Sequence, residues 1–219
     1  MKSMKVIYKI ISFSIIAFIA GCLSIPKQDN NESSVIAIKV SGTIRLGILS
    51  WDEFRPIKVF FIRLDNTDKL ISEDIIESTI NDTSWLVGRD TTYLFNVEPG
   101  KYAAVAAYGT GYASTEKLYI MFSEQLIKST IVDVEPGTFV YMGEFFAGNV
   151  SCDEIQKYYY HYFSSKNKSS NTNYFCGSLK KEFAGKNEKI KFLLTQSEKF
   201  KDTQWENNIK RTLQSLVSN

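Results

Sequence analysis

Few side chains of this protein could carry out chemistry, and thiols come first among them. The three cysteines are Cys22, Cys152 and Cys176, and His161 is the single histidine. A thiol can act as a nucleophile or pair in a disulfide, whereas one imidazole can fill one acid–base role. With no CxxC pair and one histidine, the chain is not expected to bind structural zinc, and no cofactor is expected.

The first of these thiols follows an apolar leader, residues 1–21. Lys2, Lys5 and Lys9 precede an 11-residue apolar run at positions 10–20. Such a run is too short to cross a hydrocarbon core of about 30 Å as a helix. Its length and its positive flank are typical of a secretory signal.

The end of the leader carries a more specific pattern, Ile19-Ala20-Gly21-Cys22. A branched apolar residue, two small residues and a cysteine resemble the lipobox of bacterial lipoproteins. The resemblance implies cleavage between Gly21 and Cys22, a diacylglyceryl group on the Cys22 sulfur and an acyl chain such as palmitate on the new amino group. Two or three chains would bind the membrane durably. The alternative is an ordinary secretory signal, or a membrane anchor, with a chance cysteine.

The lipobox resemblance also implies a location. The protein is expected in the cell envelope, exported and held by its acyl chains. Leu23 follows the cysteine where an aspartate would favour the inner membrane, so the outer membrane is preferred, with the periplasmic or the surface face left open.

Removal of the leader changes the charge balance. The whole chain has 26 basic and 24 acidic residues, and three of the lysines belong to the leader. The mature chain is therefore close to neutral, with a net charge of −1. It has no basic excess of the kind that nucleic-acid binding requires, so no nucleic-acid partner is expected.

Cys152 and Cys176 remain as an even pair in an oxidising compartment. They are expected to form a disulfide across 23 intervening residues, which would stabilise the fold by roughly 3 kcal/mol in the chain-entropy model. Two buried free thiols are the alternative.

Catalytic patterns are weak elsewhere in the chain. Glu73, Asp74 and Glu77 could supply the paired carboxylates of a glycoside hydrolase, but a solvated acidic face explains them more simply. His161 lies among tyrosines and is expected to have a structural or surface role. The segment 109–114, GTGYAS, lacks the third glycine of a dinucleotide-binding loop.

Three aromatic residues could instead contact a ligand. Trp51, Trp85 and Tyr112 fall in predicted loops or strand ends, where they could stack on a sugar. Packing in the core or at strand ends is the simpler interpretation.

The mature chain first shows β-strand patterns. After a polar, aperiodic segment at 24–34, runs of alternating apolar, β-branched and aromatic residues follow at short intervals. Their spacing predicts an antiparallel β-sandwich, with strands at 35–44, 58–64, 91–97, 101–108, 116–123, 129–134 and 138–147.

Two Pro-Gly segments repeat within this region, VEPGKY at 97–102 and VEPGTF at 134–139. Each predicts a type II turn between antiparallel strands, with glycine at positive φ and the following aromatic in the core. Together with Tyr141-Met142-Gly143, residues 90–147 resemble the prealbumin-like and immunoglobulin-like β-sandwich modules of exported bacterial proteins. That resemblance implies a fold and carries no catalytic residue.

The alternating pattern that predicts strands ends after residue 147. Ser151 and Glu154 suggest a capping box before a tyrosine-rich segment at 152–163, which is either a helix or a strand. Residues 189–194 could form a strand. A second capping box, Thr203 with Glu206, precedes an apolar stripe of helical spacing, which comprises Trp205, Ile209, Leu213 and Leu216.

These patterns predict a mainly β protein, an antiparallel β-sandwich with a C-terminal helical extension. Its parts are a signal peptide at 1–21, a tether at 22–34, the sandwich at 35–147 and a disulfide-stapled extension at 148–219. The function expected is that of a non-enzymatic, lipid-anchored cell-envelope protein that mediates protein or cell-surface interaction. The alternatives are a module that binds a glycan or other ligand through exposed aromatics and, less favoured, a carboxylate-based hydrolase.

Overall fold

The computed structural model describes residues 25–46, 50–64, 69–82, 91–111, 117–167 and 171–218. The leader, Cys22, Trp85 and Tyr112 lie outside these ranges. The described elements are, in chain order, β1 (Ser34–Leu46), β2 (Ser50–Arg63), β3 (Ile75–Glu77), β4 (Ile80–Asp82), β5 (Thr91–Val97), β6 (Gly100–Gly111), β7 (Lys117–Phe122), α2 (Glu124–Ser129), β8 (Val132–Val134), β9 (Phe139–Asn149), α3 (Glu154–Lys166), β10 (Thr172–Phe183), α4 (Lys186–Lys199) and α5 (Glu206–Ser218).

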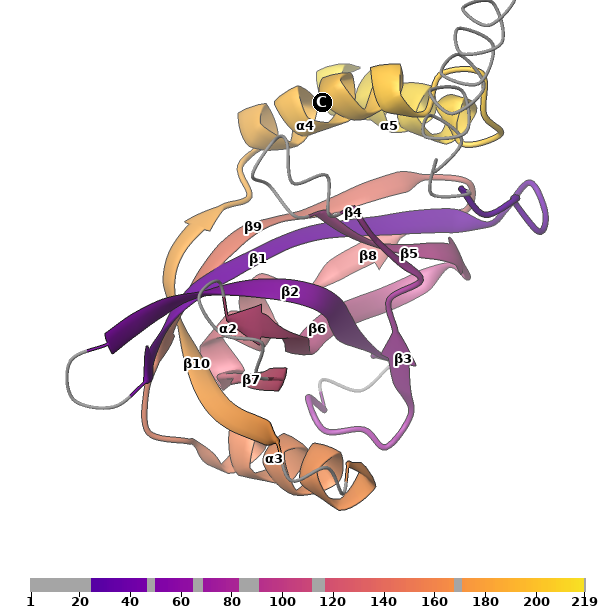
Figure 1. The fold of residues 1–219 in the computed structure, drawn as a ribbon. Coiled ribbons are helices and arrows are strands. Elements are labelled where there is room, and N and C mark those ends of the chain that lie inside the picture. Colours follow the sequence, from indigo (N-terminus) through magenta and orange to yellow (C-terminus); the bar gives the residue numbers. More distant parts are fainter. Residues whose placement is uncertain are drawn as a thin grey trace, which may run out of the picture.

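The strands form one mixed sheet that closes into a barrel (Figure 1). Its order is β3-β2-β6-β7-β10-β9-β1-β5-β4, and β1 also pairs with β2, which joins β1, β2, β6, β7, β10 and β9 into a ring. The long strand β1 makes this closure possible. Its first half pairs with β5, and its second half, from Gly42 to Leu46, pairs with β2.

The mainly β class is therefore confirmed, but the antiparallel sandwich is not. The pairs β1–β9 and β7–β10 are parallel. Parallel neighbours need a long connection between them, so residues far apart in the chain become adjacent. Alternating apolar patterns indicate a strand but do not show which strand it pairs with. The predicted antiparallel sandwich pairs strands that are neighbours in sequence. β10, from the segment 148–219, lies within the barrel wall.

Both Pro-Gly segments are corners and not hairpin turns. Gly100 and Gly137 have the expected positive φ, 156° and 64°, and Tyr102 and Phe139 are buried as predicted. However, β5 pairs with β1 and β4, whereas β6 pairs with β2, β7 and β8. β8 and β9 likewise pair with other strands. Each Pro-Gly thus passes the chain from one part of the sheet to another.

The side chains of β1 divide the core into two layers. Ile36, Ile38 and Val40 belong to the larger cluster, which includes the residues inside the barrel. Val35 and Ala37, on the other face, belong to a second cluster beneath α4 and α5. Both faces of this strand are buried because helices cover the outside of the wall that it forms.

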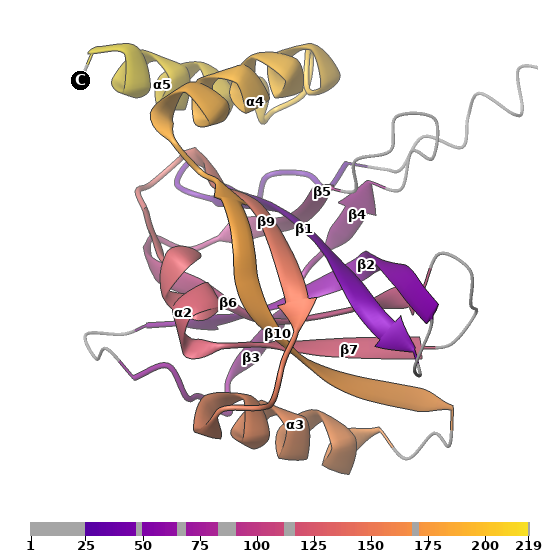
Figure 2. The ribbon, with the colours of Figure 1, turned by 90° about the vertical axis from the view of Figure 1, so that its left-hand side faces the viewer.

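Helices cover two opposite sides of the barrel. α4 and α5 lie together along β1, β5 and β9, and α3 lies on the far side below β7 and β10 (Figures 1 and 2). The tyrosine-rich segment is a helix, as one of the two interpretations held. The strand predicted at 189–194 is wrong, because these residues are in α4, where Phe192 and Leu193 face the second cluster.

The predicted stripe of α5 packs on the sheet. Trp205 and Ile209 are fully buried, and Leu213 and Leu216 pack partly buried beside them. The predicted capping box is wrong. The Thr203 hydroxyl donates to the Phe200 carbonyl, and the Glu206 carboxylate accepts from the Asp202 backbone.

Candidate functional site

The structure joins Cys152 and Cys176 in a disulfide, with a Cα–Cα distance of 5.2 Å. Cys152 lies between β9 and α3, and Cys176 is in β10. The bond therefore ties the start of α3 to the barrel wall. Gly21 and Cys22, the predicted cleavage and lipidation residues, lie outside the described ranges.

The remaining candidate residues do not converge. His161 is exposed on α3 beside the Tyr160 ring. Glu73 and Asp74 are exposed, and Glu77 forms an ion pair with Lys58. Within the described ranges, no group of three or more His, Cys, Asp or Glu side chains could hold a metal ion.

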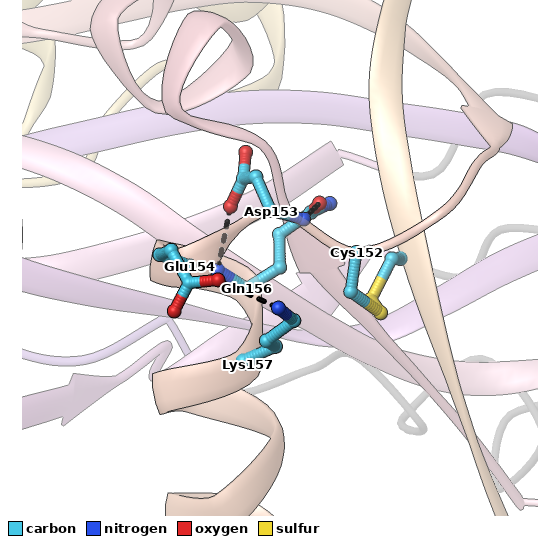
Figure 3. Close-up of polar contacts among 6 residues, drawn as sticks. Cys152, Asp153, Glu154, Gln156 and Lys157 are labelled. Carbon is cyan, nitrogen blue, oxygen red and sulfur yellow. Dashed lines mark hydrogen bonds and ion pairs between the residues drawn. A yellow bond between two sulfur atoms is a disulfide. The ribbon is translucent and has the colours of Figure 1, made fainter.

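A different set of aromatic residues lies close together in the structure, beside helix α3. Its start is fixed by a capping box different from the one predicted (Figure 3). The Asp153 carboxylate accepts from the Gln156 backbone at 2.8 Å, and the Gln156 amide oxygen accepts from the Asp153 backbone at 3.0 Å. Ser151 and Glu154 had suggested this motif two positions too early.

Gln156 also joins α3 to the barrel. Its side-chain nitrogen donates to the carbonyls of Met121 in β7 and Gly177 in β10, at 2.9 and 3.1 Å. The side chain is fully buried, so each of its polar atoms has a partner where water is excluded. The first turn of α3 thereby takes a fixed position at the end of β7 and the middle of β10.

The inward face of α3 then meets the sheet through aromatic rings. Tyr159 is fully buried and donates a hydrogen bond of 2.8 Å to the Leu70 carbonyl. Phe163, one turn later, packs against Phe60 of β2 and Tyr119 of β7, with ring centroids 4.6 and 5.2 Å apart. Residues four apart share one helix face, which explains why these two rings point the same way.

An open cleft of about 440 Å³ lies beside these rings, between the second half of α3 and the sheet. We call it the aromatic cleft. Its volume is within the range of small-molecule sites in proteins. Its lining comes from β2, β3, β6, β7 and α3, and comprises Lys58, Phe60, Ile75, Glu77, Tyr108, Tyr119, Tyr162, Phe163, Lys166 and Asn167.

Tyrosines extend the ring surface across neighbouring strands. Tyr108 of β6 lies opposite Tyr119 in the register, with ring centroids 4.8 Å apart. Tyr119 also stacks on Tyr174 of β10 at 5.3 Å and 18°, and Tyr174 contacts Tyr160 of α3. No local pattern indicates this row, because it depends on the parallel pairing of β7 with β10.

Polar groups border the aromatic cleft. Lys58 pairs with Glu77, and the Lys166 ammonium lies 4.0 Å from the centre of the Tyr162 ring. The Asn167 side chain donates to the Tyr119 hydroxyl at 2.9 Å. Burial raises the pKa of Tyr119, although the Asn167 hydrogen bond opposes this change. The hydroxyl is therefore neutral at physiological pH and retains a proton to donate.

The sequence-predicted stacking residues are not the ones found here. Trp85 and Tyr112 lie outside the described ranges, and so does the side chain of Trp51. The sequence predicts strands at Tyr108 and Tyr119 but no role for them in a site. Their signal in the sequence is faint, since alternating aromatics also suit a core strand.

Comparison of the chain with protein-family models, with curated proteins and with solved structures finds no match. Among the described residues, none of the helices has the length and the apolar character needed to cross a bilayer.

Proposed function

We propose that this protein is a lipid-anchored, non-enzymatic component of the cell envelope that binds glycan chains in the aromatic cleft. The observation that carries the proposal is the cleft itself, a cavity of about 440 Å³ with ring walls and a polar border. The anchor follows from the lipobox resemblance at Cys22, with the outer membrane as the favoured location.

A sugar suits this combination of groups. The C–H faces of a pyranose pack on aromatic rings, while its hydroxyls need donors and acceptors at the edges of those rings. Tyr108 and Tyr162 supply partly exposed rings, and Asn167, Lys166 and the tyrosine hydroxyls supply polar contacts. Two ammonium groups and one carboxylate line the cleft, which favours sugars that carry an acidic group.

The composition of the lining favours binding over hydrolysis. Glycoside hydrolases place two carboxyl groups across the scissile bond. Glu77 is the one carboxylate among the described lining residues, and it is paired with Lys58. This supports the ligand-binding alternative over the hydrolase. Glycan binding in the cleft would also be one kind of the cell-surface interaction expected from the sequence, because glycans are part of the envelope surface.

The test is titration calorimetry of the full mature lipoprotein in detergent with neutral and acidic mono- and disaccharides. We expect measurable binding with a preference for acidic sugars. Tyr108→Ala and Tyr162→Ala should each weaken it about fivefold, because one ring contact contributes about 1 kcal/mol.

Phe183→Ala is the matched control. Phe183 is a half-exposed aromatic on β10, outside the aromatic cleft, so its loss should leave the affinity unchanged. Binding that is insensitive to the two tyrosine variants, or absent for every sugar tested, would contradict a glycan site in the cleft.

A further inference from the structure

We propose that the end of the α4–α5 hairpin, residues 199–204 together with Lys27, lies directly against an anionic lipid surface. We call this the hairpin end. The inference rests on the proposed lipidation of Cys22 and adds an orientation to it. The domain would sit on the membrane in one fixed pose and would not hang from a flexible tether.

The first observation is that the described part of the predicted tether is docked. The Trp205 indole donates to the Pro26 carbonyl at 2.8 Å, and the Gln28 backbone donates to the Gln204 side chain at 2.8 Å. Ile25 packs against the buried cluster beneath α4 and α5. The chain is thus held at the hairpin from the first described residue onward.

Further contacts hold the rest of this segment. Asn96 accepts from the Asp29 backbone and donates to the Lys27 carbonyl, at 3.1 and 3.0 Å. The buried Asn208 of α5 donates to the Ser33 carbonyl at 3.0 Å. The polar, aperiodic composition of the predicted tether suggests a mobile spacer. The polar groups named above are nevertheless bonded to the domain.

The second observation is the short length of chain that remains. Leu23 and Ser24 alone separate Cys22 from Ile25. Three residue steps span at most about 11 Å even when fully extended. An acylated Cys22 would therefore hold the Ile25 end of the domain within about 11 Å of the lipid headgroups.

The third observation is charge. Residues 186–211 contain seven basic and four acidic residues, although the mature chain as a whole is slightly acidic. Lys27, Lys199 and Lys201 are exposed at the hairpin end, where Glu198 and Asp202, also exposed, are the acids next to the two hairpin lysines in sequence. Lysine side chains near a bilayer attract anionic headgroups, so these three lysines would add an electrostatic attraction to the surface that the short connection brings near.

The experiment uses the full lipidated protein reconstituted into vesicles. A spin label is placed at the exposed hairpin end by Lys201→Cys or on the opposite side of the barrel by Ser165→Cys. Nickel chelated to lipid headgroups relaxes labels that lie near them. We expect severalfold greater relaxation at position 201 than at position 165. Equal relaxation, or the reverse order, would overturn the orientation.

Two further arms separate the causes. Insertion of twelve Gly and Ser residues between Ser24 and Ile25 should abolish the difference on neutral vesicles and retain it on anionic vesicles. An unchanged difference on neutral vesicles would refute the short connection as its cause. Loss of the difference on anionic vesicles would refute the role of charge. A difference that persists there when Lys27→Gln and Lys199→Gln are added to the Lys201→Cys protein with the inserted linker would refute it as well.

Mass spectrometry of the amino terminus distinguishes the two proposals. An unacylated Cys22 overturns both the anchor and the orientation. An acylated Cys22 in a protein whose two labels relax equally overturns the orientation alone.

Discussion

Asp153 and Gln156 cap each other at the start of α3, and each also bonds to a second element. The Asp153 carboxylate accepts from the Glu124 backbone at the start of α2, at 3.1 Å, in addition to the Gln156 backbone. The Gln156 amide donates to carbonyls of β7 and β10. This pair therefore joins two helices and two strands, and it fixes the position of α3 beside the aromatic cleft.

Asp153→Ala should lower the free energy of unfolding by about 1–3 kcal/mol, because it removes the N-cap of α3 and the acceptor of the Glu124 backbone N–H at the start of α2. Urea unfolding followed by circular dichroism measures this. Glu154→Ala is the matched control, since the neighbouring Glu154–Lys157 ion pair is exposed to solvent and contributes little. Equal effects of the two substitutions would show that the cap is not what holds α3.

Reduction of the Cys152–Cys176 disulfide should destabilise the fold by about 3 kcal/mol in the chain-entropy model. It should also weaken sugar binding, since the bond ties the start of α3 to β10. Thiol alkylation of envelope-isolated protein, with and without reductant, tests whether the bond forms in the cell. Two alkylated thiols without reductant would show a free pair, and an unchanged unfolding midpoint after reduction would show that the bond contributes no stability.

Gly137→Val should destabilise the protein by more than about 1 kcal/mol, because a β-branched residue tolerates the left-handed region poorly. Gly137 has φ 64°, and an added Cβ would meet the Asn31 carbonyl at 2.8 Å and the Arg211 side chain. Gly100→Val should cost less. Both glycines have φ values that L side chains rarely adopt, but the nearest atom at Gly100, Arg63 Nε at 2.9 Å, belongs to a flexible side chain that can shift, whereas the Asn31 carbonyl beside Gly137 is backbone.

Differential scanning calorimetry compares the two glycine variants. Lipidation should be the same in both, because the signal acts before folding. A larger loss of melting temperature for Gly100→Val would show that the corner at Pro99 is the more strained of the two.

Tyr159→Phe should reduce the loss of stability at alkaline pH. Burial raises the pKa of Tyr159 well above its ordinary value of 10.0, and a backbone hydrogen bond at Ser72 offsets this only in part. Below pH 10 the Tyr159 hydroxyl is protonated in both the folded and the unfolded state, so its burial contributes fully to stability. Above it the unfolded state ionises first, unfolding releases a proton, and stability falls as pH rises.

Urea unfolding at several pH values between 8 and 11, a range of about three units around the ordinary tyrosine pKa, measures this slope. At neutral pH the variant should lose about 1 kcal/mol with the hydrogen bond to Leu70. Tyr160→Phe, on the exposed side of the same helix, is the matched control for loss of a tyrosine hydroxyl. Identical slopes for all three proteins would exclude Tyr159 as the titrating group.

Cys22→Ala should leave the precursor uncleaved by the lipoprotein signal peptidase and unlabelled by fatty acid. The reason is chemical, since the cysteine sulfur is the atom that takes the diacylglyceryl group. Metabolic labelling with a palmitate analogue measures it, and Cys152→Ala serves as the control that should still be labelled. Labelling that persists in Cys22→Ala would refute the anchor.

The sequence by itself predicted the features that depend on near neighbours in the chain. Period-2 alternation located most strands, since a strand half-buried on a sheet alternates its side chains. The stripe from Trp205 to Leu216 located α5 by its helical spacing, and the export context predicted the pair Cys152–Cys176. The resemblance to a lipobox is also local, because a signal peptidase would read those residues as an extended segment.

Tertiary structure decided everything that required a choice of partner. The sequence of β1 does not show that it pairs with β9 in parallel and closes the barrel through β2. That choice depends on how α3 and α4–α5 bury the outer wall. Tyr174 stacks on Tyr119 beside the aromatic cleft because β7 and β10 are adjacent, although about 55 residues separate their starts. The docking of residues 25–33 depends equally on Trp205 and Asn208, far along the chain. Burial of apolar surface is proportional to area and indifferent to sequence distance, and for this reason only the assembled fold could place these residues together.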